Sequence, residues 1–186
     1  MIRRSLRLSL PIIAILALGA CKPESTSTAA TPAAGESPAA TPQPTMPLPA
    51  GNMLAELSGF DLASLPSKNP CALDSINGIH PAMATVKPGD QVAFGGWLTT
   101  SKLQAPTQLM LVLSGPVTVA MSGPTSVLRP DVAKSLKVDS PLNAGFHLES
   151  RLPQMPDGHY KVALVHSTAS SLQACMTTGE LVVASK

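Results

Sequence analysis

Residues 109–124 read LMLVLSGPVTVAMSGP, and this stretch decides the fold class. Its first five residues are all apolar, which is typical of a central strand covered on both faces. A Ser-Gly-Pro turn follows at residues 114–116, and apolar residues then recur at every second position up to Met121. A period of two is that of a half-buried strand. The stretch therefore predicts two strands joined at a hairpin corner.

The same period recurs along the rest of the C-terminal region. Further strand-like runs lie at residues 91–99, 146–152, 160–165 and 180–184. Turn-forming tripeptides separate them, such as Pro88-Gly89-Asp90, Ser122-Gly123-Pro124 and Pro156-Asp157-Gly158. Short strands with regular breakers predict an all-β antiparallel sandwich, and nothing in the chain supports a βαβ unit. Residues 69–186 are enough for one two-layer core.

The glycine pair Gly95-Gly96 interrupts one of these strands. Counting by twos from Val92 and Phe94 places Trp97 on the outside. A β-bulge at the glycines would instead bury Trp97 with Phe94. Since tryptophan is usually at least partly buried, we predict the bulge.

Two short helices are expected. Residues 52–68 are predicted as a short helix or linker, with Asn52 able to cap it and Gly59 able to stop it. One or two turns cannot stand alone, so this segment either packs on the domain or frays. The second helix is expected at residues 131–136, with Asp131 as its N-cap.

The first twenty residues have the organisation of a secretory signal. Arg3, Arg4 and Arg7 precede a largely apolar run over residues 8–18. As a helix this run would rise about 16 Å, roughly half the hydrocarbon thickness of a bilayer. Residues 1–20 are therefore predicted to be a signal peptide and not a spanning helix.

The signal ends in Leu18-Gly19-Ala20-Cys21, which resembles the lipobox of bacterial lipoproteins. The resemblance implies that Cys21 receives a diacylglyceryl group, becomes the new N-terminus after cleavage and is often acylated again. Two or three acyl chains anchor a protein stably, whereas one binds marginally. By the same resemblance, Lys22 favours the outer membrane over the inner one if the cell is Gram-negative. The domain is then expected to face the periplasm or the surface. An ordinary secretory signal with a coincidental cysteine is the alternative.

Residues 21–51 form a predicted tether. Of the 29 positions from 22 to 50, seven are proline and seven are alanine, and most of the others are serine or threonine. Such a segment has almost nothing to bury and stays disordered. As a flexible coil it would reach about 30 Å, and as polyproline about 90 Å. It would hold the folded domain away from the membrane surface.

Three cysteines occur, and the lipobox accounts for Cys21. Cys71 and Cys175 remain as an even pair in an exported, oxidising compartment, which predicts a disulfide. Closing a loop of about 100 residues would stabilise the fold by about 4–5 kcal/mol on the chain-entropy model. The alternative is a reactive or metal-binding thiol, including a Cys175–His166 catalytic dyad.

A pattern of short elements runs through residues 74–184. It comprises Asp74-Ser75-Ile76-Asn77-Gly78, Gly96-Trp97, Arg129-Pro130-Asp131-Val132, Ala144-Gly145-Phe146, Gly158-His159-Tyr160 and Cys175. This pattern resembles immunoglobulin-like β-sandwich modules of the bacterial cell surface, including some appended to envelope glycosyltransferases. The resemblance implies an accessory module without a catalytic role. It also implies that Arg129 and Asp131 hold a connection in place, with Arg129 as a fork donor to backbone or carboxylate.

The composition and motifs exclude several functions. Without the signal peptide, ten basic residues face eleven acidic ones, and aromatic residues make up only 3% of the whole chain. A basic nucleic-acid surface interleaved with aromatic residues is therefore not expected. No phosphate-binding glycine loop, dinucleotide fingerprint, zinc-protease helix or serine nucleophile elbow occurs. The carboxylates show no paired spacing, and we expect no catalytic residue, cofactor or enzyme activity.

These observations predict an envelope lipoprotein whose β-sandwich is a non-catalytic interaction module, with a membrane and an envelope protein or glycan as partners. A glycan-binding accessory module is the alternative, for which Trp97 and Tyr160 offer the large polar-edged rings. A periplasmic copper-binding protein is a further alternative, because thioethers and imidazoles suit copper. Its candidate ligands are His80, Met83, His147, Met155, His159, His166 and Met176. We expect no metal, since Met83, Met121 and Met176 fall on apolar faces.

Overall fold

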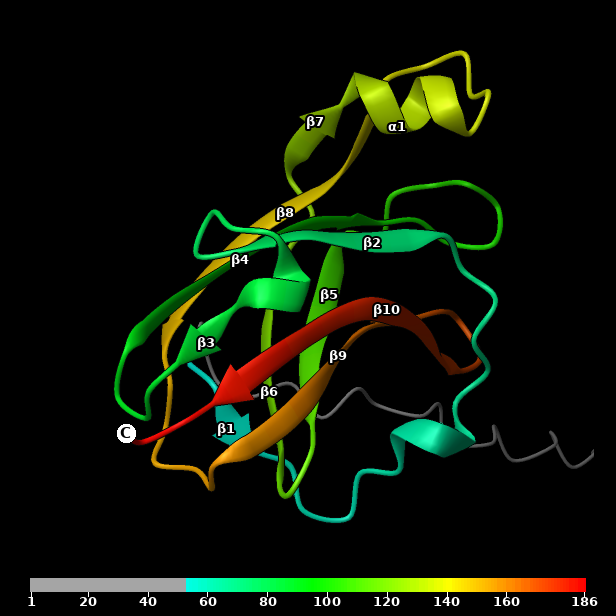
Figure 1. Cartoon of the computed structure of the whole chain (residues 1–186). Helices are drawn as coiled ribbons and strands as arrows, with labels where there is room; N and C mark the ends of the chain where they lie inside the picture. Colours follow the sequence, from blue (N-terminus) through cyan, green and yellow to red (C-terminus); the bar gives the residue numbers. More distant parts are fainter. Residues whose placement is uncertain (1–52) are drawn as a thin grey trace, which may run out of the picture. The chain divides into compact units, whose positions relative to one another are not determined.

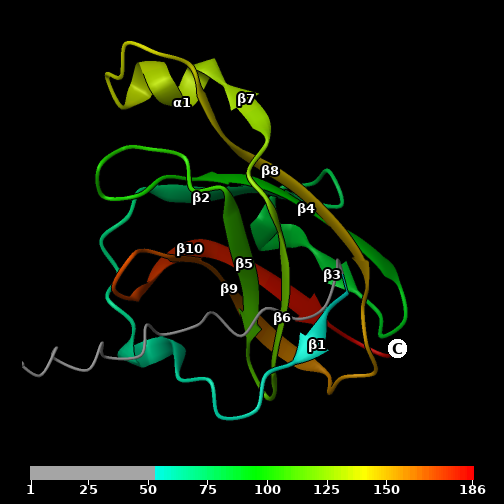
Figure 2. The ribbon, with the colours of Figure 1, turned by 180° about the vertical axis from the view of Figure 1, so that it is seen from behind.

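A computed structural model of the chain describes residues 53–186, and the predicted signal peptide, Cys21 and the tether lie outside them. Two sheets pack face to face in this region (Figures 1 and 2). Sheet A contains, in spatial order, β1 (Ala55–Glu56), β6 (Thr118–Pro124), β5 (Gln108–Ser114), β9 (Gly158–Ser167), β10 (Leu172–Val183) and β3 (Thr85–Val86). Sheet B contains β2 (Cys71–Ile76), β4 (Gln91–Leu98), β8 (Leu142–Arg151) and β7 (Val127–Arg129). The helical pieces are η1 (Leu62–Ser64), η2 (Pro81–Met83) and α1 (Pro130–Ser135).

The strand order confirms the predicted immunoglobulin-like sandwich. The order β2-β4-β8-β7 is that of the A-B-E-D sheet, and β6-β5-β9-β10 is that of the C′-C-F-G sheet. The named strands pair antiparallel except for β3, which runs parallel to β10. Tyr160, fully buried at the start of β9, donates a hydrogen bond of 2.9 Å from its hydroxyl to the carbonyl of Pro156. This contact is the tyrosine corner of such domains.

Strand β5 lies at the centre of sheet A and is covered on both faces, as its apolar run predicted. Leu111 points into the main core between the two sheets. Met110 and Val112 point the other way, into a second apolar cluster on the outer face of sheet A. All three side chains are fully buried. An alternating strand would bury only one set, so the continuous apolar run reflects a covered outer face.

The cover on that outer face is the N-terminal strap, residues 53–68. It lies beside β6 at β1 and then crosses the sheet (Figure 2). The strap residues that pack against the second cluster are Leu57, Phe60, Leu62 and Leu65. Of the two predictions for residues 52–68, the short helix at the start is wrong, because β1 occupies this place and pairs with β6. The segment packs on the domain, the predicted alternative to fraying. A turn or two of helix is costly to nucleate, whereas the edge of β6 supplies hydrogen-bond partners at once.

The bulge predicted at Gly95-Gly96 is also wrong. Strand β4 pairs with β8 in unbroken register, and Trp97 lies on the outer face of sheet B. The register shift instead lies in the neighbouring strand β2, around Asp74. Gly96 faces the core in a regular strand. A Cβ at this position would lie 2.4 Å from the carbonyl oxygen of Ala72 and 2.9 Å from the Phe146 ring, so only glycine fits. The missing side chain at Gly96 leaves room for the Phe146 ring, and β4 contains no bulge residue.

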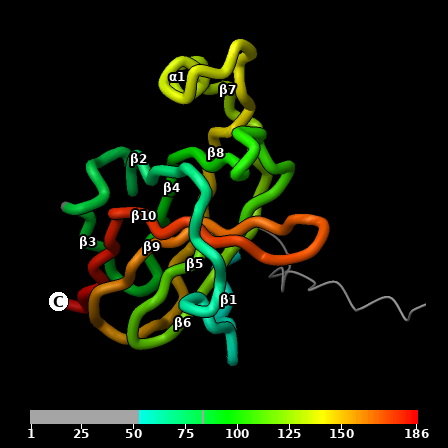
Figure 3. The backbone as a smooth tube through the Cα atoms, turned by 90° about the vertical axis from the view of Figure 1, so that its right-hand side faces the viewer, coloured from blue at the N-terminus to red at the C-terminus, as the bar shows by residue number. Residues whose placement is uncertain are grey.

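Strand β7 and helix α1 stand out from the end of sheet B (Figures 1 and 3). The helix begins at Pro130 with Arg129 as its N-cap residue, so the prediction of Asp131 as N-cap is wrong. The Asp131 carboxylate binds the Arg129 guanidinium instead. Within residues 53–186, no helix has the length and apolar character to cross a bilayer.

Candidate functional site

The outer face of sheet B is the candidate site. Its strands alternate regularly, so one set of side chains packs in the core and the other points to solvent. We define the open face as the outward positions of β2, β4 and β8, together with Asn77 next to them. These positions are Ala72, Ser75, Gln91, Ala93, Gly95, Trp97, Asn143, Gly145, His147, Glu149 and Arg151. In the structure all of them except Gly145 are exposed or part-exposed.

Trp97 is the one large ring on the open face. Its partners across the sheet are Ala72 on β2 and Gly145 on β8, and Gly95 precedes it on the same side of β4. These small residues surround a part-buried indole. A flat region of sheet with a single amphipathic ring at one end is therefore accessible to a ligand.

The Arg129 side chain bridges the two edges of sheet B. Its Nε and Nη2 donate to the two carboxylate oxygens of Asp131, at 2.9 and 2.7 Å. Its Nη1 donates to Asp74 at 2.6 Å. Arg129 belongs to β7 and Asp74 to β2, with β8 and β4 between them. At the usual strand spacing, the two edges are about 14 Å apart.

The bridge is possible because β8, the first strand that it crosses, has no side chain in the way at Gly145. A Cβ on Gly145 would lie 2.9 Å from Cγ of Arg129, so the arginine stem lies directly over this glycine. The Arg129 side chain is only 19% exposed, whereas the side chains of Asp74 and Asp131 are 43% and 63% exposed. A bidentate fork of this kind is geometrically specific. The bridge therefore ties the protruding β7 to the far edge of the sheet.

The bridge sets the local electrostatics. The hydrogen bond from Arg129 lowers the pKa of Asp131 to about 2, and its charge adds to the effect. In turn, the hydrogen bond to Asp131 is the largest cause of a raised pKa at Arg129. Both groups are ionised at neutral pH, and two carboxylates surround one guanidinium. Further along the face, His147 Nε2 and Glu149 Oε1 lie 2.8 Å apart.

A shallow hollow of about 170 Å³ lies at the other end of the open face. Its lining residues are Asn77, Gln91, Val92, Ala93 and Glu149. Asn77, in a left-handed conformation with φ of 52°, is held by two bonds to β4. Its side-chain Oδ1 accepts from the Ala93 amide, and its own backbone amide donates to the Ala93 carbonyl, both at 2.8 Å. The hollow thus has a fixed amide at its rim.

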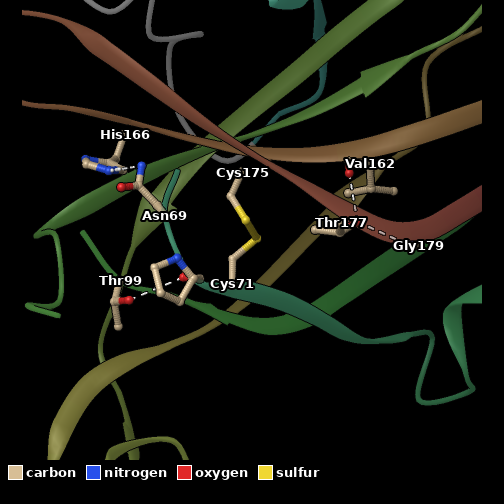
Figure 4. Close-up of a disulfide and its surroundings, with 9 residues drawn as sticks. Asn69, Cys71, Thr99, Val162, His166, Cys175, Thr177 and Gly179 are labelled. Atoms are coloured by element: carbon tan, nitrogen blue, oxygen red, sulfur yellow. Dashed lines mark hydrogen bonds between the residues drawn. A yellow bond between two sulfur atoms is a disulfide. The ribbon is translucent and has the colours of Figure 1, made fainter. Parts of the chain in front are cut away.

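The predicted disulfide is present and lies inside the sandwich. Cys71 on β2 is bonded to Cys175 on β10, with their Cα atoms 6.2 Å apart (Figure 4). The bond therefore joins sheet B to sheet A, and its cysteines are not available as thiolates. A Cys175–His166 dyad has no free thiol to use.

His166 has a structural environment near the disulfide (Figure 4). It is fully buried, with Nε2 placed 3.0 Å from Nδ2 of Asn69 and Nδ1 placed 3.2 Å from the Ser167 carbonyl. Burial lowers the pKa of His166, and the bond to Ser167 opposes this only in part. A neutral imidazole that donates from Nδ1 and accepts at Nε2 matches both contacts.

The histidines among the candidate copper ligands each have a partner of their own. His80 accepts from the Ala82 amide, His147 pairs with Glu149, and His159 pairs with Glu180. Met155 is buried in the core, but Met176 is 45% exposed, contrary to its predicted apolar face. Among residues 53–186, no group of three or more histidines, cysteines and acids has an arrangement that could hold a metal ion.

Sequence reasoning identified Trp97 and Arg129 but missed the partners that define the face. Asp74 is 55 positions from Arg129, and nothing in its local sequence indicates the contact. The available signal was the glycine at position 145, since a small residue on an outward strand position leaves room for a long side chain. Comparisons with family models, curated proteins and solved structures find no match to this chain.

Proposed function

We propose that the protein is a lipid-anchored, non-catalytic binding module of the bacterial cell envelope that engages another envelope component through the open face of sheet B. The predicted lipid on Cys21 fixes the chain to a membrane, and the tether gives the domain its reach. Other signals of function in the folded part are few, so the proposal depends on which surface remains available for a partner.

One observation carries the proposal: the chain's only tryptophan, Trp97, lies on a sheet face that neither the other sheet nor the strap covers, and across which the Arg129 side chain extends. The outer face of sheet A is covered by the N-terminal strap, and both inner faces form the core. An aromatic residue on a surface of this kind is typical of a recognition site.

The anchor is tested by mass spectrometry of the N-terminal peptide of the mature protein. We expect a lipidated Cys21 and recovery of the protein with membranes, and we expect Cys21→Ser to release it. An unmodified thiol on a fully soluble product would contradict the anchor.

The binding face is tested with two matched histidines. His147 lies on the open face and His159 on sheet A, and each is exposed and pairs with a glutamate. A photo-crosslinking residue at position 147 should capture a defined envelope component in cells, and one at position 159 should not. Trp97→Ala should abolish the capture. The same products from both positions, or none from position 147, would contradict the proposal.

A further inference from the structure

We infer that the open face of sheet B binds a neutral glycan chain, with Trp97 and the Asn77–Glu149 hollow as two ends of one site. This inference rests on the proposed function and names the class of its partner. Both ends lie on the same side of β4, because Ala93 and Trp97 are separated by an even number of positions in a strand of unbroken register. Four residues of strand span about 13 Å, so the ligand is extended and longer than one ring.

The ring end of the site suits the apolar side of a sugar. The face of an indole carries partial negative charge and attracts the slightly positive C–H groups of a pyranose. Trp97 is part-buried and held among Ala72, Gly95 and Gly145, so little ordering is needed on binding. The Arg129 bridge crosses β4 at this level on its way to Asp74, so a ligand that continues from the ring toward the hollow also lies over the Arg129 side chain.

The polar end suits hydroxyl groups. Glu149 offers carboxylate oxygens that accept from O–H groups, and Gln91 offers an amide that both donates and accepts. The Oδ1 of Asn77 accepts a hydrogen bond from the Ala93 amide, which fixes the carboxamide group. The two Nδ2 hydrogens of Asn77 can then donate to a ligand hydroxyl. A small set of placed polar groups beside an apolar contact is typical of sites for small polar ligands.

The charges of the face favour a neutral ligand over an anionic one. Arg129 is matched by Asp74 and Asp131, and His147 is paired with Glu149. Arg151 is exposed on β8 opposite Gln91 and has no ion pair within residues 53–186, but the carboxylates of Asp74, Asp131 and Glu149 outnumber the two arginines. With His147 counted as neutral, these groups sum to a net negative charge, which disfavours an incoming phosphate or sulfate. A hydroxyl-rich, uncharged chain meets acceptors without this repulsion.

The experiment uses the lipidated full chain in a detergent without a sugar headgroup, because a glycoside detergent would compete. Neutral hexose and N-acetylhexosamine oligomers, arrayed by linkage and length, are titrated while the fluorescence of the single tryptophan is recorded. We expect a saturable change for at least one oligomer and a weaker change for its monosaccharide. Trp97→Ala should weaken binding at least tenfold in an assay with labelled oligomer, and Glu149→Gln several-fold. Trp97→Phe should keep part of the affinity.

The matched control is His159→Ala, an exposed change on sheet A that should leave binding unchanged. Circular dichroism on each variant checks that the sandwich is intact. Absence of oligomer binding, or binding that survives Trp97→Ala, overturns the glycan inference. If position 147 still captures a protein in cells in that case, the binding module stands with a protein partner, and if it captures nothing both proposals fail.

Discussion

The two sheets of this sandwich are used differently. Sheet A is covered on both faces, by sheet B on one side and by the chain's own strap on the other. Sheet B is covered on one face, and its other face carries glycines, polar side chains and Trp97. The strands of sheet A are accordingly apolar on both sides, with Met110 and Leu111 both fully buried. The difference teaches that the doubly covered apolar strands lie in sheet A, and that sheet B keeps the uncovered face on which the proposed binding depends.

Removing the bond between the sheets should have the largest effect. A Cys71→Ala/Cys175→Ala double variant loses the cross-link and should be less stable by about 4–5 kcal/mol on the chain-entropy model. Urea unfolding measured with and without reductant checks this. Reductant should lower the midpoint of the native protein and leave that of the double variant unchanged, and Cys21→Ser should unfold like the native protein.

The covered face of sheet A is tested next. Met110→Ala removes a fully buried side chain from the cluster under the strap and should cost about 2–5 kcal/mol. Gln91→Ala, its counterpart on the open face, should stay within about 0.5 kcal/mol. Equal losses in urea unfolding would show that the two outer faces do not differ as described.

Gly95 and Gly96 are neighbours on β4 but face opposite sides of sheet B, so an alanine substitution at each position tests one side. Gly96→Ala places a methyl group against the Ala72 carbonyl and the Phe146 ring, and should destabilise by about 1–3 kcal/mol. Gly95→Ala meets only the Ser75 hydroxyl, which can rotate away, so its effect should be small. Thermal unfolding of the two variants measures the contrast, and a larger loss for Gly95→Ala would contradict the assigned register.

The buried His166 should make the stability of the fold depend on pH. Burial holds the pKa of His166 below its ordinary value, so the unfolded chain binds a proton more readily than the folded one. Stability should therefore fall as the pH drops through about 6.5, the usual histidine pKa, toward the lower folded value. Unfolding midpoints between pH 8 and pH 5 should decline in the native protein and less steeply in His166→Gln. A flat native profile would contradict the assignment.

The smallest change is expected at the Arg129 bridge. Its partners are half exposed, so Arg129→Gln should cost below about 1 kcal/mol. The pKa of Asp131 should rise from about 2 toward its ordinary value of 3.8, because the guanidinium no longer favours the carboxylate. The stability that this carboxylate supplies in the native protein is present above pH 3.8 and lost on acidification toward pH 2. NMR titration of the Asp131 carboxyl carbon measures the shift, and an unchanged pKa would show that the bridge is not formed.

Much of the fold follows from the sequence. The apolar run from Leu109 and the alternation around it predicted the sandwich and the doubly covered central strand. Two remaining cysteines in an oxidising compartment predicted the Cys71–Cys175 bond. Three local predictions failed: the helix at the start of the strap, the bulge in β4 and the cap at Asp131. The first two depended on partners that are distant in the sequence, and the third on Arg129, two residues away, which binds the Asp131 carboxylate.

The sequence alone determined the periodicities, the turns and the pair of cysteines, because these depend on residues close together or on simple counting. Only the tertiary structure decided that the strap covers sheet A, that Trp97 faces outward, and that Arg129 reaches Asp74. The physical reason is that a face or a bridge is a property of several strands at once. Whether a face is covered depends on what the rest of the chain lays over it.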